Sequence, residues 1–240
     1  MAGMSDGTAA RERMVETQIA ARGVADPRVL SAMRSVPREN FVPAAYRGRA
    51  HEDGPLPIGE GQTISQPYIV AVMLEAARLA ETDRLLEVGS GSGYAAAVAS
   101  RLCRTVFAIE RHAVLAEEAA RRWAALGYAN IRWRIGDGTL GWPEEAPFDA
   151  ILVSAGGPSV PHALTAQLAV GGRLVIPVGA RGHQTLARVT RTGDKTFEQE
   201  TLGDVMFVPL VGEQGWRWRT SLAFHPPPEA RRRRREGEPR

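Results

Sequence analysis

The stretch Leu86-Glu87-Val88-Gly89-Ser90-Gly91-Ser92-Gly93-Tyr94 decides the fold of this chain, because three closely spaced glycines join an apolar run to a helical pattern. Glycine adopts the left-handed backbone of a tight turn and lets a ligand approach more closely than a Cβ atom would permit. A strand, a glycine-rich turn and a helix in this order open a nucleotide-binding βαβ unit. The spacing is G-x-G-x-G, which differs from the G-x-G-x-x-G of dinucleotide-binding enzymes.

Short apolar runs alternate with helical patterns on both sides of this turn. The runs typical of strands are residues 84–88, 105–109, 131–135, 149–153 and 173–177, and the helical patterns between them cover residues 94–101, 112–126 and 161–170. This alternation predicts an α/β, Rossmann-like fold, with a doubly wound, mostly parallel sheet and helices on both faces. Two later runs, residues 185–190 and 205–210, have little helix between them and predict an antiparallel hairpin at one edge.

The amino-terminal part predicts a helical extension ahead of this domain. We expect residues 1–10 to be disordered and a first helix over residues 11–22 to stop at Gly23. A second helix is expected over residues 27–35, with Asp26 as its N-cap and a proline at its first position.

Residues 51–66 are rich in glycine and proline, and we expect them to form a loop. A loop of that length inside a compact domain is usually functional. A helix with one apolar face begins at about Pro67. The chain therefore divides into a disordered amino terminus (1–10), a helical and active-site-loop region (11–66), a cofactor-binding domain (67–220) and a disordered tail rich in proline and arginine (221–240).

Acidic residues follow the next two predicted strands. Glu110 ends the second strand, 21 residues after Gly89. A carboxylate at that place can accept hydrogen bonds from both hydroxyls of a ribose and would repel a 2′-phosphate. Asp137, between two glycines after the third strand, can accept a hydrogen bond from an adenine amino group. The pattern predicts a site for S-adenosylmethionine formed by Glu87, Gly89, Ser90, Gly91, Gly93, Glu110, Asp137 and Gly138.

Each of these features also has a simpler interpretation. Taken singly, the glycines would form only a tight turn, Glu110 a solvated strand end and Asp137 a turn aspartate.

Composition and charge exclude several classes of protein. No run of about 18 apolar residues is present, so we expect no membrane partner. The first residues lack the apolar core of a secretory signal, which favours a cytoplasmic protein. Cys103 is the only cysteine, which excludes an intramolecular disulfide and a cysteine-rich zinc site, and we expect no metal. Residues 229–240 hold six arginines and three glutamates, which account for the whole net charge of +3.

The segment Pro55-Leu56-Pro57-Ile58-Gly59-Glu60-Gly61-Gln62-Thr63-Ile64-Ser65-Gln66-Pro67 closely resembles the protein-L-isoaspartate O-methyltransferase family. The similarity covers roughly residues 11–218. It includes Asp26-Pro27-Arg28-Val29-Leu30, Val36-Pro37-Arg38, Phe41-Val42-Pro43, Gly136-Asp137-Gly138 and Phe207-Val208-Pro209-Leu210. Residues 62–67 are highly specific to the family, whereas the glycine motif is shared by many methyltransferases. The stretch Ser154-Ala155-Gly156-Gly157 departs from the family, which usually has a run richer in alanine there.

The resemblance implies that the Rossmann-like fold is that of a class I methyltransferase. It also implies an enzyme that transfers a methyl group from S-adenosylmethionine to the free α-carboxylate of L-isoaspartyl residues in damaged proteins and peptides. The ester then closes to a succinimide, which begins repair. The resemblance also implies that Gln62, Thr63, Ile64 and Ser65 lie against the cofactor in a loop that closes over it, and that Ser65 is the catalytic residue. From the residues alone, Ser65 is equally the N-cap of the following helix, and the two roles are compatible.

Two other functions stay open. A peptide-tailoring enzyme that esterifies an aspartate in a dedicated partner peptide would use the same cofactor site and serine loop. A nucleic-acid-binding protein is suggested by the arginine run and by Trp216 and Trp218. The arginine run is more typical of a solvated, disordered segment. The two tryptophans are more typical of side chains that pack over the folded body. We expect a monomer whose partners are isoaspartyl proteins and peptides, with neither nucleic acid nor membrane.

Overall fold

The computed structural model describes residues 3–217 of the chain. Residues 1–2 and 218–240 lie outside the described part. Two predictions concern residues outside the described part. They are the disordered tail over residues 221–240 and the packing of Trp218.

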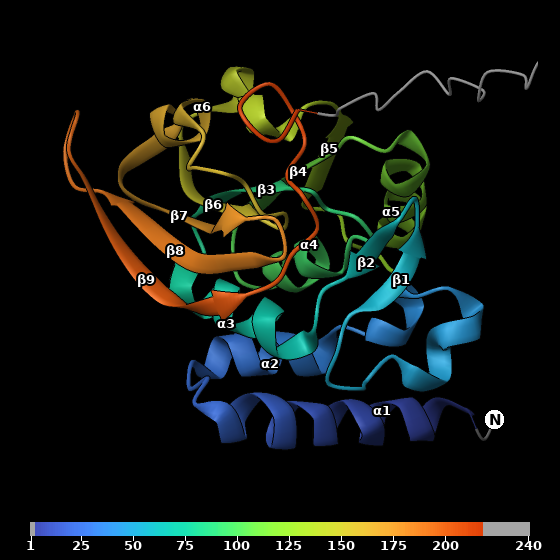
Figure 1. Ribbon diagram of the computed structural model, residues 1–240. Helices are drawn as coiled ribbons and strands as arrows, with labels where there is room; N and C mark the ends of the chain where they lie inside the picture. Colours follow the sequence, from blue (N-terminus) through green and yellow to red (C-terminus); the bar gives the residue numbers. More distant parts are fainter. Residues whose placement is uncertain (1–2, 218–240) are drawn as a thin grey trace, which may run out of the picture.

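A seven-stranded sheet forms the centre of the molecule (Figure 1). Its strands are β3 (Arg84–Val88), β4 (Thr105–Glu110), β5 (Ile131–Ile135), β6 (Phe148–Val153), β7 (Leu168–Ala180), β8 (His183–Arg191) and β9 (Phe197–Val205). The order across the sheet is β5-β4-β3-β6-β7-β8-β9, and only β8 and β9 pair antiparallel to their neighbours. The predicted doubly wound, mostly parallel sheet is confirmed. Its strand order reverses between β3 and β6, and ligands of such sheets bind beyond the carboxyl ends at this point.

Neighbouring residues of each strand point to opposite faces of the sheet, and each face packs against a different core. The two cores differ in size. Leu85 packs in the core shared with the amino-terminal extension, α3 (Pro67–Ala77), α4 (Tyr94–Ala99) and α5 (Ala113–Ala125). Leu86 packs in a smaller core on the other face, beneath α6 (His162–Ala166). The short turns η5 (Gly138–Leu140) and η6 (Pro143–Glu145) follow β5.

The amino-terminal extension is helical over a longer stretch than its sequence indicates. It comprises α1 (Gly3–Met14), a π-helical turn η1 (Val15–Ile19), η2 (Ala20–Arg22), α2 (Pro27–Ser35), η3 (Arg38–Phe41) and η4 (Ala44–Arg49). The expectation of disorder over residues 1–10 is wrong for residues 3–10. The helix is held by long-range contacts such as the Arg11–Glu39 ion pair, which leave no periodic apolar signal. The stop at Gly23 and the Asp26 cap on α2 are confirmed.

Residues 51–66 are not the plain loop that their composition suggests. They contain an antiparallel hairpin of β1 (Leu56–Gly59) and β2 (Gln62–Ile64). Leu56 and Ile58 are buried while their neighbours are exposed, an alternation that proline and glycine conceal in the sequence. The tip residues Glu60 and Gly61 both have positive φ, which tight two-residue hairpin turns require.

The antiparallel hairpin at the sheet edge is present, but its second strand is not residues 205–210. That strand is β9, whose residues are mostly exposed and polar, so it carries no apolar alternation. Residues 206–211 instead run across the carboxyl end of β6, where Gly156 donates to the Val208 carbonyl at 2.8 Å and accepts from the Leu210 N–H at 2.8 Å. Within residues 3–217, the structure contains no helix long and apolar enough to span a bilayer.

Candidate active site

The glycine turn between β3 and α4 has the backbone that its sequence predicts. Gly89, Gly91 and Gly93 have φ values of 82°, 51° and 85°, which disfavour any residue with a Cβ atom. A Cβ atom on Gly93 would lie 2.7 Å from the Trp123 ring nitrogen, which donates a hydrogen bond to the Gly93 carbonyl at 2.9 Å. The turn is therefore held against α5 by a contact that only glycine permits.

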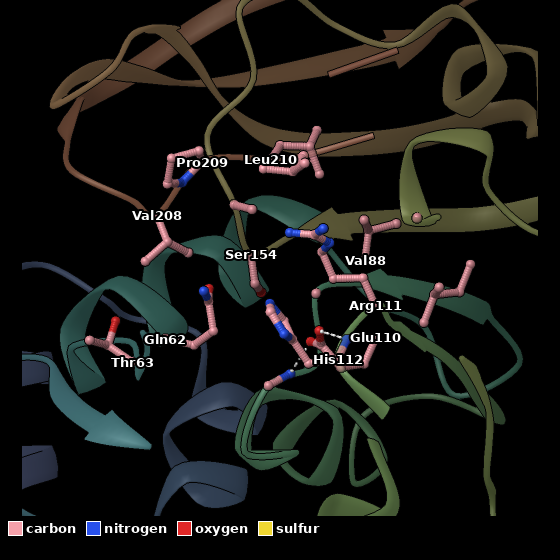
Figure 2. Close-up of a pocket in the computed structure, with 16 residues that line it drawn as sticks. Gln62, Thr63, Val88, Glu110, Arg111, His112, Ser154, Val208, Pro209 and Leu210 are labelled. Carbon is pink, nitrogen blue, oxygen red and sulfur yellow. Dashed lines mark hydrogen bonds between the residues drawn. The ribbon is translucent and has the colours of Figure 1, made fainter. Parts of the chain in front are cut away.

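Glu110 lies at the end of β4, beside the glycine turn, and is only 5% exposed. One carboxylate oxygen accepts a hydrogen bond from the Gly91 N–H at 2.9 Å, and the other accepts from the His112 N–H at 2.9 Å (Figure 2). The carboxylate thus fixes the turn and also lines the pocket in front of it. This placement supports its expected role toward ribose hydroxyls.

Replacing Glu110 with alanine should weaken cofactor binding at least about tenfold, because charge-assisted hydrogen bonds of about 1.5–3 kcal/mol would be lost. Isothermal calorimetry with S-adenosylmethionine measures this change. The Glu110→Gln variant keeps one oxygen acceptor but removes the negative charge. Comparing it with the alanine variant separates the contribution of hydrogen bonding from that of charge. Unchanged affinity in the alanine variant, with an unchanged melting temperature, would remove Glu110 from the cofactor site.

The pocket in front of the glycine turn, here the first pocket, gathers segments that are distant in the sequence (Figure 2). It is lined by Gln62, Thr63, Val88, Gly89, Gly91, Ile109, Glu110, Arg111, His112, Gly138, Ser154, Ala155, Val208, Pro209, Leu210 and Val211. These residues come from the carboxyl ends of β3, β4 and β6, from η5, from the β1–β2 hairpin and from the carboxyl-terminal segment, residues 206–217.

Two further hollows adjoin the first pocket. The second pocket is lined by Pro55, Thr63, Ser65, Gln66, Ile69, Ser154, Asp204, Val205, Met206, Phe207 and Val208. A narrow third pocket is lined by Thr63, Ile64, Ser65, Val70, Glu87, Gly89, Ser90, Gly91, Ser92, Tyr94, Ala95 and Ser154. Thr63 and Ser154 line all three, so the hollows meet between the hairpin and the end of β6.

Glu87 has an unpartnered acceptor next to this junction. Its side chain is 1% exposed, and one oxygen lies 3.4 Å from the Ser154 hydroxyl, which donates to it. The other oxygen is buried and has no hydrogen-bond partner within the described residues. Burial and, to a smaller extent, the nearby Glu110 carboxylate together raise the pKa of Glu87 to about 8. S-adenosylmethionine carries an ammonium and a sulfonium, so a buried acceptor here fits that ligand.

The Glu87 pKa predicts opposite effects on stability and binding. A folded-state pKa of about 8, above the ordinary 4.5, means that the native state binds this proton more tightly than the unfolded chain. The free energy of unfolding therefore falls as pH rises from about 4.5 to about 8. Glu87→Gln should raise the melting temperature of the cofactor-free protein above about pH 8, by about 2–4 °C per kcal/mol recovered.

The same Glu87→Gln variant should bind S-adenosylmethionine more weakly, because it cannot become an anion. Thermal melts across the pH range, with and without cofactor, measure both effects. At about pH 4.5 the stabilisation should vanish, since the wild-type side chain is then protonated in the folded protein. A pH-independent difference between the two proteins would contradict this account.

Asp137 has the turn role that the sequence left open, and a second structural role that the sequence did not indicate. Its carboxylate accepts hydrogen bonds from the Thr139 N–H at 2.9 Å and from the Glu213 N–H at 2.7 Å. It thereby ties the carboxyl-terminal segment to η5, and a Cβ atom on Gly212 would overlap one of its oxygens. Its contact with adenine stays a prediction, since Asp137 does not line the first pocket.

The structure brings together most of the residues expected at the site. Gln62, Thr63, Gly89, Gly91, Glu110 and Gly138 line the first pocket, and Ile64, Ser65, Glu87 and Ser90 line the third. Gly93 does not line these two pockets, but it belongs to the glycine turn and accepts the hydrogen bond from Trp123. Sequence reasoning missed His112 and Ser154; the position of Ser154 directly after β6, beside the strand-order reversal, is the signal that would have found it. Residues 3–217 contain no cluster of three His, Cys, Asp or Glu placed to hold a metal ion.

Trp216 packs over the body as expected. Its ring nitrogen donates to the Gly156 carbonyl at 3.0 Å, and the guanidinium of Arg181 lies 5.0 Å from its ring centroid.

The sheet order, the glycine turn and the acidic residue that ends β4 define the class of protein: this is a class I S-adenosylmethionine-dependent methyltransferase. The chain belongs to the protein-L-isoaspartate(D-aspartate) O-methyltransferase family, whose model matches residues 9–215.

Similar proteins span nearly the whole chain. It is 63% identical to the protein-L-isoaspartate O-methyltransferase of Methylorubrum extorquens (strain PA1) over 206 residues, which cover 86% of this chain and 90% of that protein. It is 55% identical to the enzyme of the same name from Rhodopseudomonas palustris (strain ATCC BAA-98 / CGA009) over 225 residues, covering 93% and 100%.

Solved structures agree with this likeness. A protein-L-isoaspartate O-methyltransferase matches with a TM-score of 0.78 at 30% identity, covering 85% of this chain and 67% of that one. A Plasmodium falciparum structure described as a protein of the same type, bound to S-adenosyl-L-homocysteine, matches with a TM-score of 0.71 at 27% identity, covering 82% and 96%.

Proposed function

We propose that this enzyme transfers the methyl group of S-adenosylmethionine to the free α-carboxylate of L-isoaspartyl residues in damaged proteins and peptides. The observation that carries the proposal is the junction of the pockets. The glycine turn and Glu110 border the first pocket, and both Ser65 and Ser154 line the second pocket as well as the third. An acceptor group in the second pocket would therefore face a methyl donor in the first and third.

The second pocket suits a carboxylate that must act as a nucleophile. Its described lining contains no arginine, lysine or histidine, and its polar groups other than Asp204 are neutral. A carboxylate held by hydroxyls rather than by a cation keeps its electron density available for attack. An α-carboxyl group is ionised at neutral pH, so no strong general base is required.

Ser65 would orient the acceptor rather than attack it. Its hydroxyl has no hydrogen bond to a histidine or an acidic residue within residues 3–217, so it lacks the activating partner that a nucleophilic serine needs. When bound, S-adenosylmethionine supplies an electrophilic methyl carbon on a sulfonium. The protein contributes alignment and exclusion of water, which together can lower the barrier by several kcal/mol.

The product then completes the repair chemistry without further catalysis. Esterification turns the carboxylate oxygen into a leaving group, methanol departs, and the backbone nitrogen on the carboxyl side closes a succinimide. Hydrolysis of that ring at its other carbonyl restores some normal aspartate.

The experiment that tests this function is a methyl-transfer assay with matched isoaspartyl and aspartyl peptides. The alternative, a tailoring enzyme for a dedicated peptide, uses the same cofactor site and predicts transfer to aspartate in that peptide alone. A monomeric state, a cytoplasmic location and the lack of nucleic-acid binding stay predictions from the sequence.

A further inference from the structure

Arg38 is a charged residue buried completely inside the protein. Its side chain is 0% exposed, and it begins the short turn η3 in the amino-terminal extension. The guanidinium donates one hydrogen bond from Nε to the Ala50 carbonyl and another from Nη2 to the Ser65 carbonyl, both at 2.8 Å. Ala50 and Ser65 stand at the two ends of the segment that contains the β1–β2 hairpin. One side chain therefore clamps both ends of this segment.

The charge of Arg38 has no carboxylate partner within residues 3–217. The neighbouring carboxylate, Glu39, is instead paired with Arg11 at 3.2 Å, and its other oxygen lies 3.2 Å from Nε2 of His51. The guanidinium lies over the ring of Tyr94, 4.7 Å from its centroid. Burial lowers the pKa of Arg38 to about 10, so the group stays cationic at neutral pH. Burial raises the pKa of Tyr94 to about 12, so that phenol stays neutral and does not balance the charge.

An unpaired buried cation is expensive, and such groups persist where geometry requires them. Two separate nitrogens of the planar guanidinium donate to the two carbonyls, whereas a lysine would have to serve both from a single nitrogen on a flexible stem. Tyr94 is the first residue of α4, directly after the glycine turn. Arg38 thus contacts both parts of the site: the hairpin segment that ends at Ser65 and the helix that follows the cofactor turn.

We propose that Arg38 is a positioning residue for methyl transfer, which holds the backbone of Ser65 at a fixed place relative to the glycine turn. The inference rests on the function proposed above. Because a misplacement of about 1 Å between reacting groups can lower a rate about a hundredfold, loss of the clamp affects turnover more than cofactor binding.

The chain offers a matched control. Arg28, on α2 of the same extension, also joins two backbone carbonyls, those of Leu79 at 2.5 Å and Leu102 at 2.6 Å, away from the pockets. Arg38→Lys and Arg28→Lys both shorten a two-carbonyl clamp while keeping the charge. Circular dichroism and calorimetry with S-adenosylhomocysteine verify that each variant is folded and binds cofactor product.

For Arg38→Lys we expect S-adenosylhomocysteine affinity within about threefold of wild type and a kcat for isoaspartyl peptide at least about tenfold lower, with little change in KM. Arg28→Lys should keep its kcat even if its melting temperature falls. Near wild-type kcat in Arg38→Lys, or equal kcat losses in both variants, would overturn the proposal.

A second measurement does not depend on turnover. Amide hydrogen exchange over residues 51–66, with S-adenosylhomocysteine bound, should be faster in Arg38→Lys and unchanged in Arg28→Lys. Unchanged exchange in Arg38→Lys would also overturn the proposal. If wild-type enzyme failed to methylate isoaspartyl peptides, the proposed function would fail, while the exchange measurement would still decide the role of Arg38.

Discussion

An isoaspartyl peptide should be methylated about a hundredfold faster than its aspartyl twin. In an isoaspartyl residue the main chain runs through the side-chain carbon, so the free carboxylate sits directly on the α-carbon. In a normal aspartyl residue the carboxylate lies one methylene farther from the main chain. A site that fixes the peptide backbone and the methyl donor must misplace one of the two carboxylates by about an ångström.

The walls of the second pocket are fixed by backbone contacts, which supports this discrimination. The Phe207 N–H donates to the side-chain oxygen of Gln184 at 2.9 Å, and the Val208 carbonyl accepts from the Gly156 N–H at 2.8 Å. On the opposite side, Pro55 and Ser65 flank the paired strands of the hairpin. These contacts hold both walls of the pocket in place.

Initial rates of labelled-methyl transfer to the two peptides measure the effect. The isoaspartyl product should lose methanol spontaneously at neutral pH, which mass spectrometry detects as formation of the succinimide. A peptide with alanine at the damaged position serves as the control for non-specific transfer. Comparable rates on the twins would refute the repair function and favour the tailoring alternative, while the cofactor site would stand.

Replacing Ser65 with alanine should lower kcat by about tenfold to a hundredfold, because one hydrogen bond to a charged group contributes about 1.5–3 kcal/mol. S-adenosylhomocysteine affinity should stay within a few-fold of wild type, since the hydroxyl is expected to act on the acceptor. Ser35, an exposed serine on α2, offers Ser35→Ala as a control that should keep full activity. Kinetics with isoaspartyl peptide and calorimetry measure both quantities.

The structure also separates this role of Ser65 from a helix cap. The residue that caps α3 is Gln66, and no side chain makes a capping hydrogen bond there. The melting temperature of Ser65→Ala should therefore change little. Full activity would remove Ser65 from the mechanism, and equal losses in binding and turnover would indicate a role in loop structure.

The sequence by itself determined the parts of this protein that depend on local pattern. Short apolar runs between helical patterns predicted β3 and β5 with their observed bounds, and Asp26 with its following proline predicted the start of α2. The glycine spacing and the acidic residue that ends β4 predicted the cofactor class, because backbone conformation and side-chain chemistry at those positions are local properties. The family resemblance pointed to the segment that carries Ser65.

Only the tertiary structure decided which distant groups act together. Strand β9 is exposed and polar, so its place in the sheet follows from pairing with β8 rather than from any pattern of its own. Asp137 holds the carboxyl-terminal segment because its carboxylate accepts a hydrogen bond from the backbone N–H of Glu213, which is far away in the sequence. Arg38 reaches Ser65 across 27 residues of sequence. Such contacts satisfy buried polar groups through long-range geometry, and no local periodicity encodes long-range geometry.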